Sequence, residues 1–283
     1  MPVIRTSTPA DIPVQRELWT LAFGDSGAYV DNFYDTYYTP ERVLVLEVNG
    51  VVRAMTAWFD TTLDVPGHAP LHTAYLYAVA THPDYRGQGL SSRLLAWADE
   101  YFRSLGFDSV ATVPARPDLH PFFAKNGFRE CFTLEQQTTL CSTSETAPSF
   151  ALEPISPVRY GEQREFLLAD TPHISYPSDA LEYQAGCCRI SGGGLYTAHT
   201  DHGPILLCAE GMEDGRLILK ELLGSPEAQT ALLSVLPALL PNFSGIYRGP
   251  GKTIPFGMLK FLCKNVENNW NGNINAYLGL AFD

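Results

Sequence analysis

The segment from Val79 to Ser92 contains residues that could bind a phosphorylated ligand. Gly87 and Gly89 have no side chains, so a ligand can approach the backbone N–H groups beside them closely. A helical apolar pattern begins at Leu90, and the first turn of a helix adds free N–H donors and a partial positive charge. The segment therefore predicts an anion site that suits a pyrophosphate.

The polar side chains of this segment allow more than one interpretation. The hydroxyl groups of Ser91 and Ser92 could donate further hydrogen bonds to a phosphate. Arg86 could either pair with a phosphate or brace the loop. Two glycines before a helix also suit an ordinary turn. A dinucleotide-binding loop needs a third glycine and a Walker loop needs Gly-Lys-Ser/Thr, and the segment has neither.

The surrounding pattern predicts a mixed α/β domain that would hold this segment between a strand and a helix. Asn49-Gly50 separates two β-branched stretches and predicts a tight hairpin turn. Apolar spacing and breaker residues predict helices over 10–24, 28–38, 89–105 and 120–126, and strands over 42–48, 51–59, 71–80, 108–113 and 128–140.

The second half of the chain repeats this order without the glycine loop. Residues 141–157 have the composition of a linker. The pattern then predicts helices over 159–168 and 225–240, and strands over 195–198, 204–210, 216–222, 246–247, 257–262 and 276–282. Gly192-Gly193-Gly194 precedes a strand, which favours a flexible turn over a phosphate loop. We interpret this half as a structural repeat of the same fold that lacks the phosphate-binding loop.

Two stretches resemble landmarks of the GNAT superfamily of N-acetyltransferases. The run from Val79 to Leu90 is similar to the family's acetyl-CoA signature, and Phe122 to Phe128 is similar to its short helix that ends in Gly-Phe. The resemblance implies the α/β GNAT acyltransferase fold with a mixed sheet. It implies an acetyltransferase domain over 1–143, a linker over 144–157 and a degenerate GNAT-like copy over 158–283.

The resemblance also implies how acetyl-CoA would bind as co-substrate. The backbone of Val79, Ala80 and Thr81 would hold the pantetheine arm like an added strand, and a backbone N–H near Val79 would stabilise the oxyanion. The pyrophosphate would be held by the amides and hydroxyls of the loop and first turn, namely Arg86, Gly87, Gln88, Gly89, Leu90, Ser91 and Ser92.

The reaction that the resemblance implies is direct attack of an amine on the thioester. The amine must first lose a proton, and the departing thiolate must gain one. The family's usual tyrosine acid corresponds to Phe123, which has no proton to donate. Tyr75, Tyr77 or water could replace it, and Asp60 or the chain end at Asp283 could be the base, but the sequence assigns neither role. A CoA-binding sensor without catalysis is the alternative function.

In this family the first two helices border the acceptor site. Residues 25–38 combine three aspartates with several tyrosines, which would suit a cationic amine by charge and cation–π attraction. Tyr34 and Tyr38 are four residues apart, so ordinary helix packing explains the pattern equally well. The expected acceptor is a small amine or a peptide.

Composition narrows the possible partners and the compartment. The 283 residues carry a formal charge of −12, with the acidic excess in both halves, which argues against nucleic acid as a partner and would attract a cation. We find neither a membrane-spanning run nor a signal peptide, and expect a cytoplasmic protein. The six cysteines lack metal-binding spacing, so we expect reduced thiols and no metal site. A homo-oligomer remains an option.

Overall fold

The computed structural model describes residues 2–139, 150–270 and 275–282. The chain divides into two compact units. The first unit comprises Met1–Leu63, Ala69–Cys131 and Phe256–Ile274, and the second comprises Asp64–His68, Phe132–Pro255 and Asn275–Asp283. Residues 256–274 thus belong with the N-terminal half. The expected linker over 144–157 lies partly outside the described residues.

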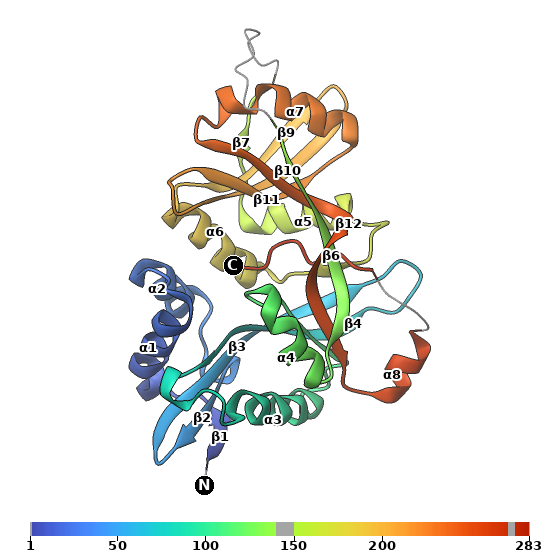
Figure 1. Ribbon diagram of the computed structural model, residues 1–283. Helices are drawn as coiled ribbons and strands as arrows, with labels where there is room; N and C mark the ends of the chain where they lie inside the picture. The colour runs from blue at the N-terminus through green and yellow to red at the C-terminus, as the bar shows by residue number, and fades with distance from the viewer. Residues whose placement is uncertain (1, 140–149, 271–274, 283) are drawn as a thin grey trace. The chain divides into compact units, whose positions relative to one another are not determined.

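The first unit is built on a mixed sheet (Figure 1). Its strands are β1 (Val3–Thr6), β2 (Val43–Val48), β3 (Val51–Asp64), β4 (Leu71–Thr81), β5 (Ser109–Thr112) and the end of β12 (Phe243–Phe261). Strands β1 to β4 pair antiparallel, β5 pairs parallel to β4, and β12 pairs antiparallel to β5. Asn49 and Gly50 both have positive φ, at 54° and 77°. This confirms the predicted tight turn, which requires left-handed residues.

Helices cover both faces of this sheet. They are α1 (Ile12–Phe23), α2 (Gly27–Thr36), α3 (Leu90–Ser104) and α4 (His120–Lys125), while α8 (Lys264–Asn269) follows β12 in the chain. Side chains alternate along β4, so Tyr77 contacts Trp19 of α1, with ring centroids 5.3 Å apart, while Leu76 packs in the cluster that contains Leu94 of α3. The helical spacing of apolar residues in α3 and the alternation of side chains in β4 therefore both follow from which side chains are buried.

The second unit has a similar order of elements. Its strands are β7 (Glu153–Pro154), β9 (Gly194–Thr200), β10 (Gly203–Gly211), β11 (Leu217–Leu223), the start of β12 and the short β8 (His173–Ser175). Its helices are α5 (Pro157–Leu167), α6 (Ser178–Ile190) and α7 (Pro226–Leu239). Helix α7 connects β11 to β12, which pairs parallel to β11, just as α3 connects β4 to β5. Strand β6 (Arg129–Thr138) begins in the first unit and ends in the second.

The structure corrects several sequence predictions in the C-terminal half. One strand, β12, replaces the two short strands expected at 246–247 and 257–262, because the Gly- and Pro-rich stretch between them stays extended. Residues 276–282 make only isolated bridges at Ala276 and Tyr277 instead of a strand. The turn expected before a strand at Gly192-Gly193-Gly194 is present at Ser191 and Gly192, and β9 follows from Gly194; a side chain at Gly193 would clash, since an added Cβ would lie 2.0 Å from the Ala209 carbonyl oxygen. Helix α6 was not anticipated.

Among the described residues, no helix combines the length and apolar character needed to cross a bilayer.

Candidate functional site

Strand β4 contains a bulge at its C-terminal half. In the β3–β4 ladder, Ala57 pairs with Tyr77 and Met55 pairs with Ala80, so Ala78 and Val79 together face one residue. Ala78 has φ of 49°, which is unusual for a residue with a side chain. A bulge of this kind bends the strand and re-aims the residues that follow it.

Strand β4 continues beyond the point where its ladder with β5 ends. The parallel pairing runs from Thr73 opposite Ser109 to Leu76 opposite Thr112, and β5 ends at Thr112. From Ala78 to Thr81, the ladders of the described residues give β4 no partner on the β5 side. The backbone edge after the bulge is therefore open to an extended ligand that pairs as a strand does.

The turn after β4 is braced by side chains. The Arg86 Nε donates to the Thr81 carbonyl oxygen at 3.2 Å, and Gln88 Nε2 donates to the Asp84 carbonyl oxygen at 3.3 Å. Of the two interpretations of Arg86, the structure shows the bracing contact. The main-chain loop is thus held in place by its own residues.

The loop glycines have the left-handed conformation that only glycine adopts easily. Gly87 and Gly89 both have φ of 74°, and a Cβ at either position would meet no atom within 4 Å. Gly89 is the N-cap of α3 and provides no side chain to cap it. The first-turn N–H groups of α3 therefore have no side-chain acceptor at the N-cap, and the space above both glycines is open.

Contacts on either side of the loop fix the helix start to the strand end. The Thr81 and Ser91 hydroxyl oxygens lie 2.6 Å apart, joining the last residue of β4 to the first turn of α3. Leu90 is buried and anchors the helix in the core that also contains Leu94. Ser92 is half-buried in the same turn. Strand end, loop and helix start therefore form one braced unit.

Arg53 is a cation of this region that the sequence analysis did not single out. Its carbonyl oxygen accepts a hydrogen bond from His82 N at 2.9 Å, and its guanidinium lies over the Tyr85 ring at 4.6 Å. Its Nε is buried and has no hydrogen-bond partner among the described residues. An arginine within the apolar stretch Val51–Met55 is the sequence signal that could have marked it.

The helix pair α1 and α2 shows ordinary side-chain packing and also an exposed carboxylate that suits a cation. Trp19 Nε1 donates to Asp25 at 2.7 Å, and Arg16 pairs with Asp31, so two of the three aspartates have partners. The Tyr34 and Tyr38 rings lie 5.2 Å apart. Asp35 is exposed. Packing and pairing account for most of this cluster, and the charge of Asp35 faces solvent.

The candidate acid and base residues lie at different distances from the bulge: Tyr77 directly precedes it, whereas Asp60 lies farther along the strand pair. Phe123 is 4% exposed and packs against Phe128, with centroids 5.5 Å apart. Asp60 Oδ1 lies 2.7 Å from His72 Nε2, and Asp60 is the cross-strand partner of Ala74 in the β3–β4 ladder. At about 3.3 Å per residue, that register places Asp60 roughly 15 Å from Val79. Asp283 lies outside the described residues.

Comparison with known proteins agrees with this geometry. The sequence model of the family described as "Acetyltransferase (GNAT) domain" matches residues 3–130. A tRNA(Met) cytidine acetyltransferase of Aeropyrum pernix is 33% identical over 86 residues. That match covers 28% of this chain and 12% of the archaeal protein, so the chain spans only a small part of that relative.

Solved structures share the fold over nearly the whole chain. A GCN5-related N-acetyltransferase from Kribbella flavida has a TM-score of 0.69 at 16% identity, covering 94% of this chain and 72% of that one. One from Anabaena variabilis has a TM-score of 0.67 at 15% identity, covering 94% and 74%. These likenesses show the GNAT fold. The family match adds that residues 3–130 are similar to the GNAT acetyltransferase domain.

Proposed function

We propose that the chain binds acetyl-CoA along β4 and α3 and transfers the acetyl group to a primary amine. One observation carries this proposal: the edge of β4 from Ala78 to Thr81, which has no β5 partner, leads directly into a glycine loop and an uncapped helix start. An extended pantetheine arm fits the first feature, because it can form backbone hydrogen bonds like a strand. A pyrophosphate fits the second.

In this proposal the ligand contacts follow the chain in order. The backbone of Val79, Ala80 and Thr81 pairs with the pantetheine arm. The bulge directs a backbone N–H near Val79 toward the thioester carbonyl. The pyrophosphate lies at the loop and first turn of α3, where the contacts are made by Arg86, Gly87, Gln88, Gly89, Leu90, Ser91 and Ser92. The unpaired Nε of Arg53 adds positive charge nearby.

The proposed reaction is a single displacement within a ternary complex. An ammonium acceptor loses a proton to water, its nitrogen lone pair forms a C–N bond with the thioester carbonyl, and the carbonyl oxygen carries the negative charge. Collapse of this intermediate breaks the C–S bond. The nitrogen loses a second proton to solvent and the thiolate gains one. Backbone N–H groups preorganised at the bulge stabilise the oxyanion.

We propose a cationic acceptor, a small amine or an amino terminus, that approaches past α1 and α2. The exposed carboxylate of Asp35 and the overall charge of −12 support an acceptor of positive charge. We also infer that the second unit is a degenerate GNAT-like copy. The shared order of antiparallel strands, a crossover helix and a parallel strand supports that inference.

A non-catalytic CoA-binding module is the second candidate, and one observation favours it. Phe123 stands where the family's tyrosine acid would be, and it is buried in an apolar cluster. A chain that binds CoA but lacks a proton donor for the thiolate would turn over slowly. Solvent protonation of the thiolate is the step that distinguishes the two candidates.

One experiment separates these functions. Binding of CoA is measured by calorimetry, and free thiol is measured during incubation with acetyl-CoA and a panel of polyamines, aminoglycosides and peptides. The proposal expects saturable CoA binding and amine-dependent thiol release. Binding without turnover across the panel would favour the non-catalytic module. No binding at millimolar CoA would overturn both.

A further inference from the structure

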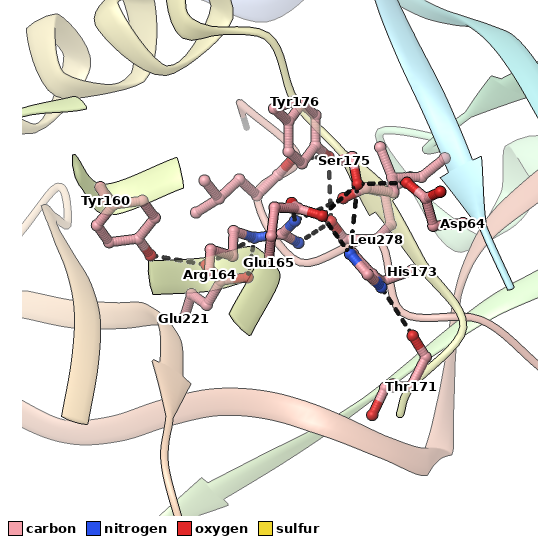
Figure 2. Close-up of polar contacts among 12 residues, drawn as sticks. Asp64, Tyr160, Arg164, Glu165, Thr171, His173, Ser175, Tyr176, Glu221 and Leu278 are labelled. Carbon is pink, nitrogen blue, oxygen red and sulfur yellow. Dashed lines mark hydrogen bonds and ion pairs between the residues drawn. The ribbon is translucent and has the colours of Figure 1, made fainter. Parts of the chain in front are cut away.

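The second unit holds a cluster of metal-ligating side chains away from the glycine loop. His173 and Ser175 are two residues apart on β8, so both side chains lie on one face of the strand. Glu165 of α5 and Asp64 at the end of β3 face the same point. Figure 2 shows the four side chains converging, with Ser175 joined to Asp64 and Glu165 by dashed contacts.

The imidazole of His173 is oriented by a contact outside the cluster. Its Nδ1 lies 2.7 Å from the Thr171 carbonyl oxygen. A carbonyl only accepts, so Nδ1 carries a hydrogen and Nε2 is directed at the cluster, 2.8 Å from Glu165 Oε2. A backbone acceptor on one ring nitrogen, with the other turned toward carboxylates, is the usual arrangement of a metal-binding histidine.

The Ser175 hydroxyl lies between two carboxylates. The Ser175 hydroxyl lies 2.6 Å from both Asp64 Oδ2 and Glu165 Oε2, yet it has one hydrogen. His173 Nε2 lies 3.3 Å from the same hydroxyl oxygen. The hydroxyl can therefore donate to only one of the two carboxylates, and the Nε2 nitrogen of His173 faces the same point. A cation at the shared point would satisfy all three acceptors.

The neighbouring guanidinium of Arg164 does not supply a positive charge at the centre of the cluster. Arg164 approaches the other oxygen of Glu165, with Nη1 3.6 Å from Oε1. Its Nε bonds both oxygens of Glu221 at 3.1 Å, and its remaining nitrogens bond backbone carbonyls of Ile174 and Leu278. The guanidinium is thus committed to the buried Glu221, which is 0% exposed. The Oε2 side of Glu165 is left facing His173, Ser175 and Asp64.

We propose that Asp64, Glu165 and His173 bind a divalent transition-metal cation, for which zinc is the best match. One ligand atom from each residue lies within 4.8 Å of the other two. Zinc takes imidazole and carboxylate ligands at about 2.0–2.2 Å, and the Ser175 hydroxyl or water would complete a tetrahedral set. The short contacts within the cluster widen as the cation replaces the shared hydrogen. Magnesium and calcium prefer all-oxygen sites, so the imidazole disfavours them.

Exposure of the cluster suits a site that binds reversibly. The side chain of His173 is 5% exposed, whereas that of Glu165 is 42% exposed. The imidazole is thereby fixed, while one carboxylate leaves a path for the ion and for ligand water. Asp64 lies far along the chain from Glu165 and His173, which are eight residues apart, so bound zinc would stabilise the second unit by linking α5, β8 and residue 64.

The test uses the full chain with Cys263→Ser as background, because Cys263 is an exposed thiol that could itself bind zinc. After chelator treatment, zinc chloride is titrated by calorimetry. The expected result is one zinc ion per chain, a higher melting temperature with zinc, and affinity at least about tenfold weaker in both H173A and E165Q. X-ray absorption of the zinc-loaded chain should show nitrogen and oxygen ligands without sulfur.

His120→Ala is the matched control. His120 also contacts a carboxylate, with Nδ1 2.7 Å from Glu130 Oε1, but no third ligand was found there among the described residues. Zinc affinity should be unchanged in H120A. Absence of saturable binding, equal affinity in E165Q, sulfur ligation, or preference for magnesium or calcium would each overturn the proposal. If H173A fails to fold, the zinc affinities of the near-isosteric variants E165Q and D64N test the proposal instead.

Discussion

The two units use the same connection, a strand followed by a crossover helix, but they satisfy the helix start differently. Helix α3 begins at Gly89, which has no side chain to cap it. Helix α7 begins at Ser225, whose hydroxyl oxygen accepts from Ala228 N at 3.2 Å, and Pro226 follows as a residue without an N–H. The start of α3 lacks a capping side chain, whereas at the start of α7 Ser225 caps one N–H group and Pro226 has none to satisfy.

The strands that lead into these helices differ in the same way. Both contain a bulge: Ala78 and Val79 form it in β4, and Lys220 is the extra residue in β11. Lys220 is buried and its Nζ lies 3.3 Å from Glu210 Oε2. The second bulge is therefore occupied by an internal ion pair, whereas the first borders an open strand edge. A shared topology thus does not imply a shared ligand site, because the polar groups decide it.

The largest effect should follow from Gly89→Leu. A leucine at φ of 74° is strained, and its side chain would cover the exposed donors of α3, so CoA affinity should fall at least about tenfold. Gly215→Leu is the matched control, since Gly215 has φ of 78° and equally open space in a turn of the second unit. Calorimetry with CoA compares the two. Equal affinity in G89L and the parent chain would refute the pocket assignment.

The β4 bulge should be sensitive to a β-branched residue. Ala78→Val places a branched side chain at φ of 49°, and we expect a loss of about 1–2 kcal/mol in the free energy of unfolding. Ala78→Gly tolerates this φ and should cost less than Val. Urea unfolding of both variants measures the difference. If A78V and A78G are equally stable, the bulge is not strained.

Capping should distinguish the two helix starts. Ser225→Ala removes the acceptor for Ala228 N and should cost about 1 kcal/mol of stability while leaving CoA affinity unchanged. Ser91→Ala removes the contact with Thr81 and should show the opposite pattern, with a smaller stability loss and weaker CoA binding. Thermal unfolding and calorimetry on both variants test this. If S225A and S91A changed stability and CoA affinity in the same way, the two helix starts would not differ as described.

The smallest effect concerns acid stability of the first unit. Hydrogen bonds from Arg5 hold the pKa of Asp11 below its ordinary value of 3.8. Because the folded-state pKa is depressed, the stabilisation is present above that value and is lost as the pH falls below it. Asp11→Asn should therefore cost about 1 kcal/mol at pH 7, and the difference should shrink below about pH 4.

Asp118→Asn is the control for that prediction. Asp118 pairs with Arg116 at 3.0 Å, but both side chains are exposed, so solvent screens the pair. Unfolding of both variants is followed from pH 7 downward. A pH-independent difference between D11N and the parent chain would show that the Arg5 contact does not act through ionisation.

Much of the first unit could be predicted from local sequence. The periodic leucines of α3 and the alternation in β4 match the burial that the structure shows. The Asn49-Gly50 turn and the glycine loop also followed from local conformational preferences. The mixed α/β fold with the GNAT topology is confirmed for the chain, while the roles of the loop residues in binding remain proposals.

Other features could not be predicted because they depend on residues far apart in the sequence. Residues 258–261 pair with β5, and the Lys260 ammonium bonds the buried carboxylate of Asp99 on α3. The cluster of Asp64, Glu165 and His173 likewise depends on long-range contact, because Asp64 lies far along the chain from the other two residues. The buried, unpaired Nε of Arg53 follows from packing beside Tyr85.

The sequence by itself determined where backbone conformation had to be special: a left-handed turn at residue 50, two left-handed glycines before α3, and an amphipathic helix after them. These features depend on side-chain size and periodicity over a few residues. Only the tertiary structure decided where β4 separates from β5 and how β12 returns to the first unit. Those outcomes depend on long-range pairing, in which the free energy of burying one strand against another outweighs local preference.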